Sequence, residues 1–191
     1  QNLLPRELPQ MPGWSVAAYW QPAREVSGDF YDFIHMPDGR LAFLVADVTD
    51  KGVPASLVMA TTRSLLRSNT ERYTSPGKVL EITNNLLCPD IPDKMFVTCL
   101  YGVLDPQTGE IVLANAGHNL PYQHTTHGVV EHRARGMPLG LMPGMRYDEI
   151  TIKLDPGDTL LLTSDGLDEA HNAQREMFGF ERVKMLLADH E

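Results

Sequence analysis

An unbroken apolar run at residues 41–46 (LAFLVA) constrains the fold of this chain more than any other segment. A strand with one face in water alternates apolar and polar residues, whereas a run without a polar break predicts a strand covered on both faces. A hairpin signal precedes the run, because Phe30 to Ile34 has strand character and Pro37-Asp38-Gly39 is typical of a tight turn. We therefore expect a sheet that is buried on both sides of this strand.

The other segments mix helices and strands in an irregular order. Two helices are predicted, one from Gly52 through Arg67 and one that Ser75 caps and Pro76 begins. Further strands are predicted at residues 96–104, 110–116, 120–124, 128–132, 147–154 and 159–163, and a closing helix at 180–188. This order lacks the regular strand–helix alternation of a parallel sheet. We therefore expect an α+β fold, with antiparallel sheets and helices on the outer faces.

Length and charge narrow the class of protein. A chain of 191 residues, 42% of them hydrophobic, can bury one substantial core, so we expect one domain over residues 13–191. Residues 1–12 contain Leu3, Leu4 and Leu8 between prolines, and we interpret them as the end of an upstream linker or helix. The net charge of -9 argues against a nucleic-acid partner, and no segment has the roughly 18 consecutive apolar residues of a membrane helix. The two cysteines and the lack of a leader favour the cytoplasm.

Three aspartates lie where predicted strands meet turns of small residues. They are Asp29 in SGDFYD (27–32), Asp47 in ADVTDKG (46–52) and Asp165 in TSDGLDE (163–169). An aspartate in such a place is held by a rigid element and still reaches solvent, which suits a hard cation. Gathered carboxylates would repel one another unless a divalent ion lay between them. The alternative is that each aspartate caps a helix or stabilises a turn, and Asp32 and Asp50 fit that interpretation too.

These segments resemble the ordered motifs of the SpoIIE/RsbU-type phosphatases, a bacterial branch of the PPM (PP2C-like) family. The motifs are REVSGDFYD at 24–32, ADVTDKG at 46–52, NAGHN at 115–119 and SDGLDEA at 164–170, with Leu139-Gly140, Pro156-Gly157-Asp158 and Phe178-Gly179 at the family's usual places. The resemblance covers nearly the whole chain. It implies an αββα sandwich, in which two antiparallel sheets are flanked by helices.

The resemblance also implies a binuclear Mn²⁺ or Mg²⁺ centre. Asp47 would bridge both ions, Asp29 and the backbone carbonyl of Val48 would complete the protein ligands of one ion, and Asp165 would hold the other. Two such cations activate a water for in-line attack on a phosphate group. The implied enzyme is a protein phosphatase, a hydrolase acting on phosphoserine or phosphothreonine.

The sequence departs from the family pattern at two places in this site, and the role of one histidine is undecided. Asp50 stands where family members often have glycine, and it could be an acid behind the ligands or a helix cap. The further aspartate next to asparagine that many eukaryotic relatives use as a ligand is missing after Glu169, so the ion on Asp165 would bind weakly. His118 could protonate the leaving alkoxide, or it could be a loop histidine bonded to backbone. The role of Asp168 is also open.

The family implies partners as well. Its substrate is typically an anti-sigma-factor antagonist with a STAS domain, in partner switching during bacterial stress responses. We expect an upstream sensory or receiver domain, whose connecting helix could pair between protomers to give a homodimer. The flap between Gly117 and Tyr147, with Arg133 and Arg135, is where we expect substrate contacts. Two alternatives are a catalytically silent interaction module and a two-metal nuclease or phosphodiesterase, which the acidic charge disfavours.

Overall fold

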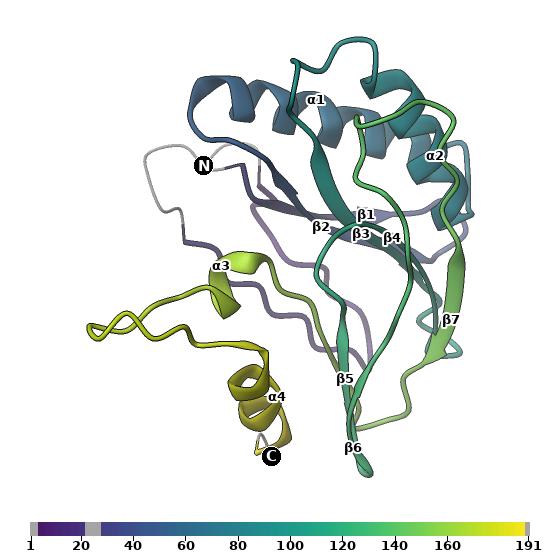
Figure 1. Cartoon of the computed structure of the whole chain (residues 1–191). Helices are drawn as coiled ribbons and strands as arrows, with labels where there is room; N and C mark the ends of the chain where they lie inside the picture. Colours follow the sequence, from purple (N-terminus) through teal and green to yellow (C-terminus); the bar gives the residue numbers. More distant parts are fainter. Residues whose placement is uncertain (1–3, 22–27, 190–191) are drawn as a thin grey trace. The chain divides into compact units, whose positions relative to one another are not determined.

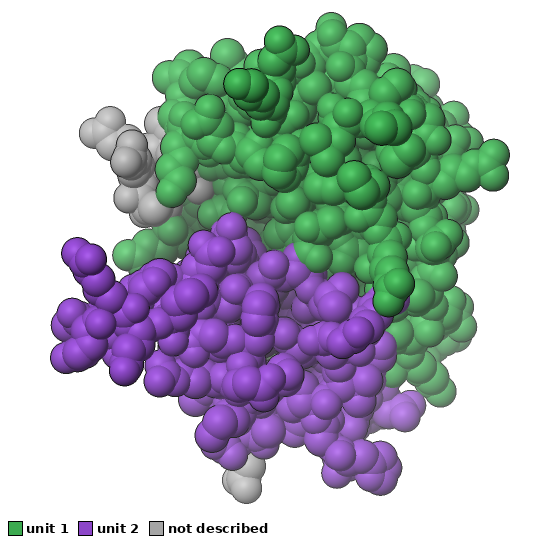
Figure 2. Space-filling model, viewed as in Figure 1, with its two compact units in different colours: residues 1–118, 134–153 green, residues 119–133, 154–191 purple. Residues whose placement is uncertain are grey.

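The computed structural model describes residues 4–21 and 28–189, and the chain forms two compact units (Figures 1 and 2). Unit 1 contains residues 1–118 and 134–153, and unit 2 contains residues 119–133 and 154–191. Figure 2 shows unit 1 in green and unit 2 in purple. Each unit is built on its own antiparallel sheet. The chain passes from one unit to the other three times, after residues 118, 133 and 153.

Unit 1 contains a five-stranded sheet with the strand order β1-β2-β3-β4-β7. The strands are β1 (Phe30–His35), β2 (Leu41–Val48), β3 (Val97–Leu104), β4 (Glu110–Ala116) and β7 (Glu149–Lys153). Every neighbouring pair is antiparallel, and the predicted hairpin of β1 and β2 is confirmed. Four consecutive residues of β2, 41–44, are buried, as expected for a strand that is covered on both faces.

Two helices cover one face of this sheet (Figure 1). The helix α1 (Val53–Thr70) contacts β1 and β2, and α2 (Pro76–Leu87) contacts β3 and β4. The helix α1 begins after Gly52, whose φ of 89° favours glycine, and a proline stands in its first turn. The Ser75 hydroxyl caps α2 by accepting a hydrogen bond from the Lys78 amide at 3.1 Å. Both predicted helix starts are therefore confirmed.

The main hydrophobic core lies between these helices and the sheet. Its largest fully buried side chains include Tyr101, Phe30 and Leu66. The Tyr101 hydroxyl lies 2.8 Å from Thr70 Oγ1, so the buried phenol keeps a hydrogen-bond partner. Leu4 packs against the edge of this core, and residues 4–12 form bends and turns without a helix. Leu3 lies outside the described residues, so the predicted linker at residues 1–12 and the domain boundary after it stay predictions.

Unit 2 contains a three-stranded antiparallel sheet with the order β6-β5-β8. The elements are β5 (Tyr122–Thr125), β6 (Gly128–Glu131), β8 (Thr159–Leu161), α3 (Asp165–Asp168) and α4 (Phe180–Ala188). The helix α4 packs on β5 and β6, where Val183 and Leu187 join Tyr122 in a small core. The one-turn helix α3 was not predicted, whereas the closing helix was.

Antiparallel sheets accompanied by helices in both units make an α+β fold, as the order of predicted elements indicates. Apolar and small residues alternate over residues 14–20, but this segment forms no regular strand. Within residues 4–21 and 28–189, no helix combines the length and the apolar character needed to cross a membrane.

Candidate metal centre

Asp29 and Asp47, two of the three predicted metal ligands, lie together in unit 1. Phe30 of β1 pairs with Ala46 of β2, and the same antiparallel register carried one residue further sets Asp29 opposite Asp47. A carboxylate oxygen of Asp29 and one of Asp47 lie within 4.8 Å of each other. Both residues are half-buried. Two carboxylates at this separation on adjoining strands can hold one divalent ion between them.

Gly28 keeps open the space in front of the Val48 carbonyl. A Cβ atom on residue 28 would lie 2.6 Å from Val48 O, which is closer than real Cβ atoms approach, and 3.3 Å from Asp47 Oδ1, which is a tight contact. The carbonyl therefore faces the same small space as the Asp47 carboxylate. With Asp29, these residues offer two carboxylates and one carbonyl, an all-oxygen set of the kind that Mg²⁺ and Mn²⁺ prefer. The residues present fit a hard divalent cation.

Hydrogen bonds to Phe96, the residue before β3, fix the backbone that follows Val48. The Thr49 amide donates to Phe96 O at 3.0 Å, and the Phe96 amide donates to Thr49 Oγ1 at 2.9 Å. On the other strand, Trp20 Nε1 donates to the Asp29 carbonyl at 3.1 Å. Both predicted carboxylate ligands are thus attached to backbone that is tied to neighbouring segments, so their positions are set before any ion binds.

Asp165, the third predicted ligand, belongs to unit 2. It is the first residue of α3, and Ser164 before it is extended, with a φ of -89° and a ψ of 171°. The one-turn helix is closed by the Glu169 amide, which donates to Asp165 O at 2.8 Å. The Asp165 carboxylate is exposed at the surface of its unit. Its role as a ligand stays a prediction.

Asp168, one turn further along α3, is a buried acid of unit 2. Its side chain is 5% exposed, and Asn119 Nδ2 donates to Asp168 Oδ1 at 3.0 Å. Burial raises the pKa of the Asp168 carboxyl, and the hydrogen bond from Asn119 offsets part of that rise. Asp168 therefore ties the start of the segment at Asn119 to α3, which is a structural role.

Asp32 is also structural and not a turn residue. It is completely buried on β1, where Arg67 of α1 approaches it with Nε 2.6 Å from Oδ2 and Nη2 2.7 Å from Oδ1. Arg63, one turn earlier on α1, has its Nε 2.9 Å from the same Oδ2. The hydrogen bond to Asp32 raises the pKa of Arg67. The sequence contained a sign of this contact, because two arginines four residues apart lie on one face of a helix and can meet the same acid.

Asp50 is not the cap of α1. The residue at the N-cap is Gly52, and the structure describes no side-chain hydrogen bond there. Asp50 is exposed, has a φ of 73°, and accepts a hydrogen bond from the Lys51 amide at 2.9 Å on its own Oδ1. A left-handed φ suits glycine or aspartate, which agrees with the glycine that family members often have at this position.

His118 is joined to Thr98 and Asn115 by hydrogen bonds. Its Nδ1 lies 2.8 Å from Thr98 Oγ1, and Asn115 bonds its main chain in both directions, through His118 N and His118 O. The residue is 8% exposed. The hydrogen-bond partner that the structure describes for Nδ1 is thus the Thr98 side chain.

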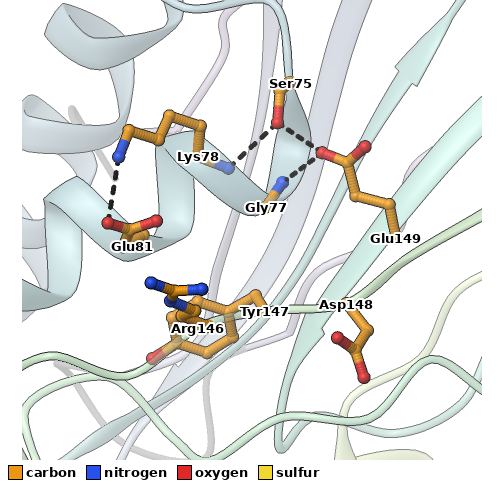
Figure 3. Close-up of a pocket in the computed structure, with 8 residues that line it drawn as sticks. All are labelled: Ser75, Gly77, Lys78, Glu81, Arg146, Tyr147, Asp148 and Glu149. Atoms are coloured by element: carbon orange, nitrogen blue, oxygen red, sulfur yellow. Dashed lines mark hydrogen bonds and ion pairs between the residues drawn. The ribbon is translucent and has the colours of Figure 1, made fainter.

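A shallow polar cavity of about 530 Å³ opens elsewhere on unit 1 (Figure 3). Its lining residues are Ser75, Gly77, Lys78, Glu81, Arg146, Tyr147, Asp148 and Glu149. Figure 3 shows the Glu149 carboxylate at the start of α2, where its Oε1 accepts hydrogen bonds from the Ser75 hydroxyl and from the Gly77 amide, the latter at 2.8 Å. The chain's own carboxylate therefore occupies the N-terminus of α2 in this cavity.

The α+β fold, with an oxygen-ligand pair at one end of its larger sheet, defines a PP2C-like domain. The SiaA-PP2C domain of Pseudomonas aeruginosa superposes on this chain with a TM-score of 0.78, at 25% identity over 90% of this chain and 70% of that one. A family model described as Stage II sporulation protein E (SpoIIE) matches residues 37–191. The chain belongs to the SpoIIE family.

Two curated relatives extend the comparison. Protein IcfG of Synechocystis sp. is 33% identical over 96% of this chain, and Phosphoserine phosphatase RsbU of Bacillus subtilis is 29% identical over 88% of it. The chain spans about a third of the length of IcfG (33%) and about half that of RsbU (51%). The similarity confirms the predicted SpoIIE/RsbU-type resemblance.

Proposed function

We propose that this chain is the catalytic domain of a metal-dependent serine/threonine protein phosphatase. The observation that supports this most is the Asp29–Asp47 carboxylate pair beside the Val48 carbonyl. It occurs in a SpoIIE-family chain, and the relative RsbU is named a phosphoserine phosphatase. An all-oxygen site with two acids suits a cation that must bind phosphate oxygens and water together.

The proposed ligands follow from the predicted assignment. Asp29, Asp47 and the Val48 carbonyl would hold one divalent ion, and Asp47 with Asp165 of unit 2 would hold a second. Mn²⁺ or Mg²⁺, when bound, supplies an activated water and stabilises charge on the attacking and leaving oxygens. The chain's own residues hold the carboxylates in place, and Gly28 keeps the Val48 carbonyl accessible.

The cysteines support a water-based reaction. Cys99 is completely buried, and burial raises the pKa of its thiol far above neutrality. Burial also raises the pKa of the half-buried Cys88. A cysteine phosphatase needs an accessible thiolate of low pKa, which neither residue provides. We therefore propose that water attacks the phosphate directly and that no phosphocysteine intermediate forms.

The substrate we propose is a protein carrying phosphoserine or phosphothreonine, of the STAS-type antagonist class, in partner switching. The relatives RsbU and RsbP of Bacillus subtilis are both named phosphoserine phosphatases. The segment from Gly117 to Tyr147, which contains β5, β6 and the exposed Arg133 and Arg135, is the proposed contact region. An upstream sensory or receiver domain, a homodimer and a cytoplasmic location stay predictions.

The test is phosphate release from a phosphoserine protein and from an aryl phosphate, with Mn²⁺ and with chelator. We expect Mn²⁺-dependent release that Asp47→Asn and Asp29→Asn abolish and that Asp165→Asn strongly lowers. Asp38→Asn is the control, since Asp38 pairs with Arg40 in an exposed turn. Release that persists in chelator or in Asp47→Asn would refute the proposal. Cleavage of phosphodiesters in preference to phosphomonoesters would favour the nuclease alternative, and no release would favour the silent module.

A further inference from the structure

Thr98 lies beside the backbone of the proposed bridging ligand. The β2–β3 register sets Thr98 directly opposite Asp47, and Thr98 Oγ1 lies 3.4 Å from the Asp47 carbonyl oxygen. The same hydroxyl lies 2.8 Å from His118 Nδ1. All three residues belong to unit 1. A line of contacts therefore runs from the imidazole to the backbone of the metal site.

The imidazole at the start of this line is held rigidly. Asn115, which is 1% exposed on β4, donates from Nδ2 to His118 O at 2.9 Å and accepts from His118 N at 2.7 Å. Gly117 between them has a φ of 69°, and a Cβ there would lie 2.8 Å from the Pro138 ring. The turn thus fixes the main chain from which the imidazole extends, and His118 as a whole is only 8% exposed.

The hydroxyl of Thr98 has one proton to give. It can donate to His118 Nδ1 or to the Asp47 carbonyl, and not to both at once. When His118 carries its proton on Nδ1, the imidazole donates to Thr98 Oγ1, and the hydroxyl proton is directed to Asp47 O. This arrangement satisfies every partner in the line, because each acceptor then meets a donor.

We propose that His118 and Thr98 act as positioning residues that set the metal affinity of the site by fixing the backbone at Asp47 and Val48. The inference rests on the proposed function. A carbonyl ligand has no side-chain torsion with which to adjust, so the position of Val48 O depends on how its backbone is held. Partners behind the ligands commonly change metal affinity by about 10–100-fold when they are removed. In this role His118 acts through Thr98 and does not protonate the leaving group.

The first measurement is Mn²⁺ binding itself, from the electron paramagnetic resonance signal of free Mn²⁺ titrated with protein. Thr98→Val removes the hydroxyl and keeps the shape, and we expect it to weaken binding about 10-fold. Thr98→Ser restores the hydroxyl and should restore the affinity. Thr62→Val is the matched control, because Thr62 is completely buried and its hydroxyl has no hydrogen-bond partner in the described part of the chain.

Two substitutions at His118 separate positioning from proton transfer. An asparagine amide reaches the place of Nδ1, whereas a glutamine amide reaches the place of Nε2. We expect His118→Asn to bind Mn²⁺ within about 3-fold of wild type and His118→Gln to bind it about 10-fold more weakly. At saturating Mn²⁺, kcat for an aryl phosphate should stay within about 3-fold of wild type for Thr98→Val.

Unchanged Mn²⁺ affinity in Thr98→Val and His118→Gln would overturn the inference. A fall in kcat for His118→Asn at saturating Mn²⁺, with kcat retained by His118→Gln, would overturn it in favour of proton transfer. Wild-type protein that binds Mn²⁺ through Asp47 and releases no phosphate would contradict the proposed function alone. In that case, the positioning inference is still decided by the affinities of the variants.

Discussion

Arg67 and Asp32 join α1 to β1 through two hydrogen bonds, from Nε to Oδ2 at 2.6 Å and from Nη2 to Oδ1 at 2.7 Å. Replacing Asp32 by alanine leaves Arg63, whose side chain is only 18% exposed, without its counter-charge. We expect Asp32→Ala to lower the free energy of unfolding by about 3 kcal/mol, at the lower end for a broken buried pair. We expect a loss at the lower end of the range for buried pairs because the Arg67 side chain is 41% exposed, so water screens its charge. Urea denaturation measures this loss.

Asp38→Ala is the control for that experiment. Asp38 also pairs with an arginine, Arg40, but both side chains are substantially exposed. Exposed pairs contribute little to stability, so the urea midpoint should barely change. Equal shifts of the urea midpoint for Asp32→Ala and Asp38→Ala would show that the buried ion pairs of Asp32 stabilise the fold no more than the exposed pair of Asp38.

Gly28→Ala should damage the metal centre. Its Cβ would lie 2.6 Å from Val48 O, so either the strand start or the carbonyl must move. We expect Mn²⁺ affinity to fall at least about 10-fold, as measured by isothermal titration calorimetry. Gly102→Ala is the matched control, since its Cβ would clash with the Phe43 ring inside the sheet. That variant should lose thermal stability and keep its Mn²⁺ affinity at a temperature where it is folded.

Asn84 and Asn85 provide a second matched pair. Asn84 is completely buried, and its amide accepts from Gly140 N at 2.9 Å and donates to Met142 O at 2.8 Å. Asn85 is exposed and accepts one hydrogen bond, from Gly144 N. We expect Asn84→Ala to cost about 2–3 kcal/mol of unfolding free energy and Asn85→Ala about 0.5–1 kcal/mol. Urea denaturation of both variants measures the difference, and equal losses would contradict it.

His132 of unit 2 should make stability depend on pH. Burial lowers the pKa of its imidazole below 6.5, and His132 Nε2 lies 2.8 Å from Gln123 Oε1. The unfolded chain therefore takes up a proton at a higher pH than the folded chain. This contribution to stability is complete above pH 6.5 and is lost as the pH falls from 6.5 through the folded pKa.

The measurement for His132 is the difference in Tm between wild type and His132→Gln at pH 7.5 and at pH 5.5. Glutamine keeps a donor for Gln123 and does not titrate, so the wild type should lose more stability than the variant on acidification. Parallel losses would show that His132 is not the titrating group.

Local signals in the sequence were sufficient for most elements of the fold. Ser75 and Pro76 predicted the start of α2 because capping is a contact between near neighbours. The apolar run in β2 predicted its burial for a similar reason. The one-turn helix α3 escaped prediction, since four residues give no periodic pattern.

The sequence could not give the contacts between distant residues. Asp32 looked like a turn residue because its partners, Arg63 and Arg67, follow more than 30 residues later. The contact of Thr98 with His118 likewise depends on the pairing of β3 with β4. Asp29 and Asp47 were predicted as ligands from motifs, and the β1–β2 register supplies the physical reason that they meet.

The three passages of the chain between the units determine how much of the sequence each sheet needs before it has all of its strands. The five-stranded sheet cannot be completed until β7 (Glu149–Lys153) has left the ribosome, although the residues of β5 and β6 are made before it. A released chain that is truncated after residue 160 therefore contains all five strands of this sheet, together with Asp29 and Asp47, yet lacks Asp165. The last of the proposed ligands is thus the only one encoded after the complete set of strands of the larger sheet.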